Sequence, residues 1–124
     1  MTRNNSGPDI AGYLPLKPTV FTILMVLADG MAHGYGIKKD VEQRSDGRIR
    51  LEPGTLYRLI GKLLDDGFIE EAPGSNRATE DDERRRYYRL RPLGRKVLVA
   101  ETERLAAMID AARAKRLIPT AGPS

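Results

Sequence analysis

The amino-acid sequence predicts a mostly α-helical fold with one small β-hairpin, built as a single domain that continues into a long C-terminal helix. Apolar residues recur at helical spacing in most segments, two short strand-like runs flank a polar stretch, and residues 92–116 form one long helical pattern. A chain of 124 residues provides one hydrophobic core. We expect a mobile N-terminal tail at 1–13, a main domain at 14–91, the final helix at 92–116 and a C-terminal tail at 117–124.

The composition indicates a soluble globular protein that is not built around cysteine oxidation. Apolar residues make up 40% of the chain and charged residues 31%, so the chain can bury a core and keep a charged surface. Lys and Arg exceed Asp and Glu by 21 to 17, and this surplus suits a polyanionic partner. The absence of cysteine excludes disulfides, thiolate metal sites and a cysteine nucleophile. Residues 1–8 lack a signal pattern and the apolar run 23–28 is too short to cross a bilayer, so we expect a cytoplasmic protein without a membrane partner.

Two helices are expected in the first half of the main domain. Apolar residues are so dense at 18–28 that periodicity alone does not separate a buried strand from a buried helix. Pro18 suits a first helical turn and Gly30 a C-terminal stop, and these positions favour the helix. A second, short helix is expected from about Tyr35 to Arg44, where apolar residues lie one turn apart and charged residues face outward.

The segment 52–67 has the clearest helical pattern in the chain. Pro53 fits the first turn and Gly67 the C-terminal cap. At about 100° per residue, one arc of roughly 140° carries the apolar side chains, namely Leu56, Leu59, Ile60, Leu63 and Leu64. The opposite face is small and basic near its N-terminus; it comprises Gly54, Arg58, Gly61, Lys62 and Asp65, with Thr55 and Tyr57 at its borders.

Two strand-like runs follow, at residues 68–72 and 86–90, and predict a hairpin. The polar stretch 73–85 between them is too long for a tight turn, so we expect an exposed flap.

Residues 92–116 predict a final helix that is long for a small domain. Its seam residues are spaced alternately four and three apart, as in a short coiled coil; they are Leu98, Thr102, Leu105, Ile109 and Ala112, and Met108 is assigned to the same surface. A monomer of this size leaves no other element for this helix to pack against. We therefore expect a second copy of the chain to pack against it, which makes a homodimer. Packing of the seam on its own domain is the alternative.

The order of these elements is that of a winged helix-turn-helix with an added dimerisation helix. A major groove about 12 Å wide admits one α-helix, whose first amides attract phosphate. Gly54 would let the backbone of the helix come close to the DNA, while Arg58 and Lys62 would reach bases or phosphates. Two such heads on one dimer call for a roughly palindromic site. The flap would carry further cations toward flanking DNA, namely Arg77, Arg84, Arg85 and Arg86.

Four stretches of the sequence resemble the PadR family of transcriptional regulators, over about residues 14–108. They are His33-Gly34-Tyr35-Gly36-Ile37, Pro53-Gly54-Thr55-Leu56-Tyr57-Arg58-Leu59-Ile60, Leu63-Leu64-Asp65-Asp66-Gly67-Phe68-Ile69 and Tyr87-Tyr88-Arg89-Leu90 with Gly94-Arg95. The resemblance implies a winged helix whose recognition helix is residues 53–66, and a homodimer that commonly acts as a repressor of transcription. The single long C-terminal helix is similar to the short-form subgroup, some of whose members hold a small hydrophobic effector between subunits.

The resemblance and the helical pattern together predict an interface with double-stranded DNA. Its expected residues are Tyr35, Pro53, Gly54, Thr55, Tyr57, Arg58 and Lys62, with the flap residues Arg77, Arg84, Arg85 and Arg86. Two departures from the family pattern stand out. Arg91 occupies a position where a threonine often caps the last helix, and the chain lacks the tryptophan that stacks on planar effectors in drug-binding relatives.

Several of these residues also have a purely structural interpretation. Arg58 and Lys62 would then be solvated charges on an amphipathic helix, and Tyr35 and Tyr57 would be packing residues. The arginines at 84–86 follow acidic residues that nearly cancel their charge.

No cofactor or metal site is expected. His33, the only histidine, suits a turn or the start of a helix, and the acidic run 80–83 lacks the spacing of a cation-binding loop.

Two other classes of function remain as rivals. A winged helix that binds another protein would share this core but need no basic face, and salt would not affect its complex. An enzyme is disfavoured because the chain has no cysteine, one histidine and no pair of carboxylates on facing elements.

Overall fold

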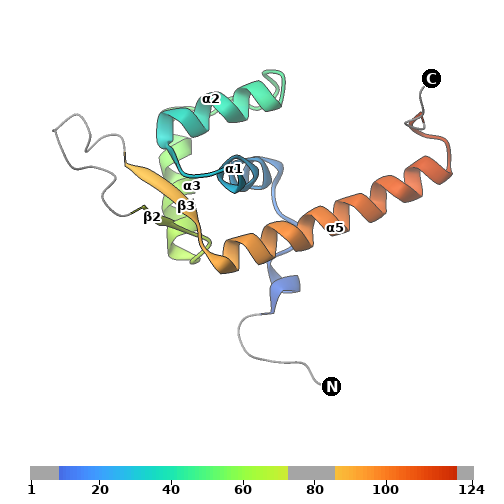
Figure 1. Ribbon diagram of the computed structural model, residues 1–124. Helices are drawn as coiled ribbons and strands as arrows, with labels where there is room; N and C mark the ends of the chain where they lie inside the picture. Colours follow the sequence, from blue (N-terminus) through green and yellow to red (C-terminus); the bar gives the residue numbers. More distant parts are fainter. Residues whose placement is uncertain (1–8, 73–85, 120–124) are drawn as a thin grey trace.

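The computed structural model describes residues 9–72 and 86–119 (Figure 1). The expected flap, with Arg77, Arg84 and Arg85, lies outside these residues. None of the described helices is long and apolar enough to span a membrane.

Helix α1 (Pro18–Ala28) lies at the centre of the fold, where it packs against α2, α5 and strand β3 (Figure 1). Its bounds are those predicted from the proline at its start and the glycine beyond its end. Ile23 and Leu24 are completely buried, which explains why its apolar residues are too dense to show one amphipathic face.

Helices α2 (Gly34–Arg44) and α3 (Pro53–Asp65) form the helix-turn-helix. Helix α2 begins one residue earlier than predicted because Nδ1 of His33 accepts a hydrogen bond from the Gly36 amide at 3.0 Å. Two side chains hold the turn between the helices, one from α2 and one from the residue that caps its C-terminus. The Ile49 amide donates to Oγ of Ser45 at 2.9 Å, and the Leu51 amide donates to the Glu42 carboxylate at 3.2 Å.

The wing is part of a three-stranded antiparallel sheet in the order β1-β3-β2. Strands β2 (Ile69–Glu71) and β3 (Tyr87–Leu90) form the predicted hairpin, with Ile69 opposite Leu90. Strand β1 (Ala32–His33) was not predicted; it pairs with the other edge of β3 and links the wing to the start of α2. Two residues are too few to show a strand pattern in the sequence.

The N-terminal segment differs from the expected tail where the structure describes it. Residues Ile10–Tyr13 form a short 3-10 helix, η1, that begins at an Asp9 cap and packs against α5. The Tyr13 ring meets the edge of the Phe68 ring, with centroids 4.9 Å apart. The few apolar side chains of this segment pack against the core and hold it in place. The sequence prediction missed this because residues 1–8, just before the segment, are polar.

Helix α5 (Pro92–Ala114) begins at the predicted proline. The side chain of Arg91, at the N-cap position, makes no capping hydrogen bond, as the departure of Arg91 from the family pattern suggested. The first turn of α5 lies against the end of α3 and the start of β2. The Arg91 amide donates to the Phe68 carbonyl at 2.9 Å, and a Cβ at Gly94 would collide with that carbonyl. The glycine therefore sets how closely α5 approaches the wing.

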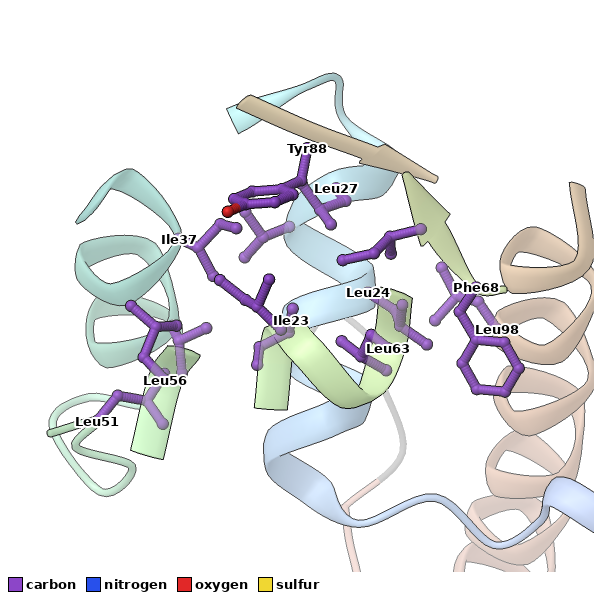
Figure 2. Close-up of a cluster of buried hydrophobic side chains, with 14 of the residues drawn as sticks. Ile23, Leu24, Leu27, Ile37, Leu51, Leu56, Leu63, Phe68, Tyr88 and Leu98 are labelled. Atoms are coloured by element: carbon purple, nitrogen blue, oxygen red, sulfur yellow. The ribbon is translucent and has the colours of Figure 1, made fainter. Parts of the chain in front are cut away.

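The core gathers side chains from every major element around α1 (Figure 2). Two positions differ from the sequence prediction. Leu64, assigned to the buried face of α3, is 37% exposed. Leu98, assigned to the expected dimer seam, is 6% exposed and packs in the core of its own chain, as the alternative interpretation of that seam anticipated.

Candidate nucleic-acid interface

The N-terminal half of α3 presents a small, open face to the surroundings. Pro53 and Gly54 in the first turn are exposed, and a Cβ at Gly54 would meet no atom within 4 Å. Thr55 is half-buried at the edge of the face, and Arg58 is exposed one turn further on. The buried side of the helix is held by Leu56, so the opposite side faces outward. This half of α3 can therefore approach another surface closely.

The two basic residues of this face differ in their partners. Lys62 forms an ion pair with Asp66 at 3.3 Å, but the Lys62 side chain is 70% exposed, so the pair is weak and easily exchanged. Arg58 forms no salt bridge with any residue that the structure describes. As far as the described residues go, its guanidinium is available to an external acceptor.

Tyr57 links α3 to the start of α2. A Cβ at Gly34 would lie only 2.6 Å from the Tyr57 hydroxyl oxygen, so Gly34 leaves the space in which this ring rests. Tyr57 as a whole is still 46% exposed. Tyr57 therefore both packs against α2 and contributes to the open face, so the packing and surface interpretations describe two parts of one side chain.

Tyr35 lies outside the core, in contrast to the packing interpretation. The side chain is 60% exposed, and the Lys39 ammonium lies 5.6 Å from the centre of its ring. Tyr35 and Lys39 thus add an aromatic ring and a positive charge to the first turns of α2.

Arg48 and Arg50 were not predicted as site residues. Both are exposed in the turn between α2 and α3, and no salt bridge to either occurs among the described residues. The turn lies outside any periodic element, and sequence reasoning therefore passed over it. The available signal was two arginines shortly before the start of α3.

The described part of the wing is largely neutralised by its own carboxylates. Arg86 pairs with Glu71 at 3.3 Å and Arg89 with Glu70 at 2.7 Å across the strands. Arg86 is the one predicted wing residue within the described part, and its pair is exposed enough to exchange for a phosphate.

Carboxylates with shifted pKa values belong to the scaffold. The Lys38 ammonium and the Leu51 amide hold the pKa of Glu42 below its usual value. Hydrogen bonds from Arg104 lower the pKa of Glu101, with a smaller contribution from the Leu16 amide. Among the described residues, no cluster of three side chains could ligate a metal. His33 caps α2, which agrees with its structural interpretation.

The chain is similar to a bacterial protein of undefined activity and to several solved regulators. It is 37% identical over 86 residues to an uncharacterised 37.1 kDa protein in transposon TN4556 of Streptomyces fradiae; the match covers 69% of this chain and 22% of that protein, so the chain spans about a fifth of its relative's length. A transcriptional regulator from Clostridium thermocellum is 28% identical, with a TM-score of 0.62 over 85% of this chain and 91% of that one.

Another solved structure supports the fold, and a family model decides the membership. A PadR family transcription regulator from Clostridium difficile R20291 has a TM-score of 0.64 at 19% identity, over 79% of this chain and 97% of that one. The model of the transcriptional regulator PadR-like family matches residues 23–100, which include the helix-turn-helix, the wing and the start of α5. The members of this family are regulators of transcription. The chain therefore belongs to the PadR-like family of transcriptional regulators.

Proposed function

We propose that this protein is a homodimeric transcriptional regulator that binds a palindromic DNA operator with α3 in the major groove. The observation that carries the proposal is the exposed N-terminal half of α3, where Gly54 leaves open space and Arg58 has no acidic partner among the described residues. An α-helix with such a face fits the width of the groove, and a free guanidinium can bind the acceptors of a guanine or a phosphate.

The surroundings of α3 supply the contacts that would position it. Arg48 and Arg50 before the helix, with Tyr35 and Lys39 on α2, are exposed on the same helix-turn-helix. Cations of this kind bind phosphates and fix the register of a recognition helix without reading bases. We assign Arg58 and Thr55 to contacts in the major groove. We assign the cations of the turn and of α2 to contacts with the phosphates of the DNA backbone.

The C-terminal half of α5 supports the dimer. It extends beyond the other helices (Figure 1), and its apolar side chains Met108 and Ile109 are 56% and 46% exposed. Leu105 and Ala112 lie between exposed and buried on the same helix. A second copy would cover these residues, and the two-fold axis would place two α3 helices on one palindromic site. We therefore restrict the proposed seam to Thr102 and the residues that follow it.

Repression and release by an effector complete the proposal. A dimer seated on an operator blocks access to that DNA, and the family resemblance favours this outcome. The exposed apolar residues Met108 and Ile109 would border any small hydrophobic effector held between two α5 helices.

The test compares operator binding with binding to scrambled DNA over a range of salt concentrations. The operator is first selected from a random pool with the intact protein. Arg58→Ala should weaken operator binding by about 1–3 kcal/mol for each base contact it removes. Arg48→Ala should weaken binding to both DNAs and lower the slope of log K against log salt by about one per lost phosphate contact.

Lys96→Ala is the matched control, because Lys96 is an exposed cation of α5 on a different element from the proposed interface. Unchanged operator affinity in a folded, dimeric Arg58→Ala variant would contradict the groove assignment. Salt-independent capture of a protein instead of DNA would favour the protein-interaction module.

A further inference from the structure

A hollow of about 330 Å³ lies between the N-terminal segment and α3, beside the proposed DNA-binding face. Its apolar lining includes Val20 and Leu59, which are half-buried, and Leu63 and Phe68, which are buried. A volume of this size is at the lower end of the range for small-molecule sites. The hollow is separate from the exposed apolar residues of α5, where an effector between subunits would lie.

Three cations belong to the lining of this hollow. Lys17 comes from the start of α1, while Arg58 and Lys62 come from successive turns of α3, and all three are exposed. The single carboxylate in the lining is Asp66, which pairs with Lys62 at 3.3 Å. Three positive charges against one negative charge leave a positive surplus in the lining of an otherwise apolar depression.

We propose that this hollow binds a small amphipathic carboxylate, with the apolar body against Val20 and Leu59 and the carboxylate at Arg58. Guanidinium groups match carboxylates in geometry, and an apolar lining gains free energy when it is covered. Residues 1–8, the neighbouring segment of this chain, include an arginine and no acidic residue, so their charge does not match the site.

Binding of the carboxylate and of DNA exclude each other, because Arg58 and Lys62 belong to both surfaces. This step rests on the proposed function. A carboxylate that holds the Arg58 guanidinium removes it from the groove, and DNA that holds Arg58 closes the mouth of the hollow. The coupling is reciprocal, so an operator must weaken carboxylate binding by the factor by which carboxylate weakens operator binding.

The site itself is tested without DNA, by titrating the intact ¹⁵N-labelled protein with octanoate below its micellar concentration. We expect the amide resonances of Val20 and Leu59 to shift and saturate. Octan-1-ol and octylammonium, with the same chain length, should bind at least about tenfold more weakly because they lack the negative charge. Equal shifts for all three compounds, or no shift for octanoate, would overturn the proposal.

Variants then locate the site. Lys17→Glu should lower octanoate affinity by about tenfold, since it reverses a charge at the mouth that the DNA interface does not use. Lys96→Glu makes the same change on the exposed face of α5 and should leave octanoate affinity unchanged. Equal affinity in wild type and Lys17→Glu would place the binding elsewhere and reject the hollow.

Competition is measured last, with the selected operator. Octanoate at ten times its dissociation constant should raise the apparent Kd for operator about tenfold for each occupied site that must be vacated. An unchanged operator Kd under saturating octanoate would overturn the competition. If the protein binds no DNA at all, the proposed function fails, whereas the titration without DNA still decides whether the hollow binds a carboxylate.

Discussion

Glu101 of α5 accepts a hydrogen bond from the backbone amide of Leu16, at 3.1 Å and across 85 residues of sequence. The same carboxylate accepts two hydrogen bonds from Arg104, from Nε at 2.7 Å and from Nη2 at 2.8 Å. Its side chain is 2% exposed, which makes it the one charged residue buried among the described residues. Glu101 thus fastens the segment before α1 to α5.

Glu101→Gln should destabilise the protein by about 1.5–3 kcal/mol, the usual contribution of hydrogen bonds to a charged group. The amide keeps the size of the side chain but replaces one acceptor oxygen with a donor that faces Arg104 or Leu16. Urea unfolding measures the change. Glu103→Gln, two residues away and exposed, is the control and should be nearly neutral. Similar effects from both variants would mean that the buried contacts contribute nothing specific.

The Glu101 carboxylate should also make stability depend on pH in the acidic range. Arg104 holds the pKa of Glu101 in the folded protein below its usual value, so the unfolded chain takes up this proton first as the pH falls. The stabilisation is complete above the ordinary glutamate pKa of about 4.3 and is lost as the pH falls from there through the lower folded-state pKa. Unfolding free energies from pH 7 to 3 should fall less steeply for Glu101→Gln than for wild type; parallel curves would contradict this assignment.

Gly34→Ala should weaken operator binding more than it weakens the fold. The new Cβ would meet the hydroxyl end of Tyr57, which can rotate away, and alanine favours the helix that begins here. We expect the unfolding free energy to stay within about 1 kcal/mol of wild type. Displacement of Tyr57 would shift a side chain of the recognition helix, and the operator Kd should rise. An operator Kd equal to that of wild type would show that the position of Tyr57 has no role in DNA binding.

Gly94→Ala should destabilise the fold by about 1–3 kcal/mol or more, because its Cβ would collide with the backbone carbonyl of Phe68 and not with a flexible side chain. Gly61→Ala is the matched control. It also places alanine inside a helix, but its Cβ would meet no atom within 4 Å, so it should stabilise the protein by about 0.5–1 kcal/mol. Thermal unfolding distinguishes the two. Stabilisation by both variants would mean that α5 can move away from β2 at little cost.

Ile109→Asp should convert the proposed dimer to a folded monomer. Ile109 is 46% exposed in the protomer, so a carboxylate there costs little until a partner buries it. Light scattering gives the mass, and circular dichroism shows whether the monomer stays folded. Ala107→Asp, exposed and roughly 160° away on the α5 surface, should remain dimeric. A wild-type monomer at micromolar concentration would refute the dimer.

Local sequence signals were sufficient for the helices and for much of the proposed interface. Pro18 and Gly30 set the extent of α1, and the spacing of apolar residues in α3 placed Arg58 on the exposed face. These predictions hold because caps and helical periodicity act within a few residues. Arg48 and Arg50, outside any periodic element, were visible in the sequence only as a short basic run.

Tertiary contacts alone decided the remaining features. Strand β1 exists because β3 offers it an edge, Leu98 lies in its own core because α5 packs on α1, and Glu101 is buried because the Leu16 amide meets it. A glutamate in a helical pattern would be assigned to solvent from sequence alone. The hollow beside Arg58 likewise lies between segments that are about 40 residues apart in the sequence. No local sequence pattern shows that these segments are close in space.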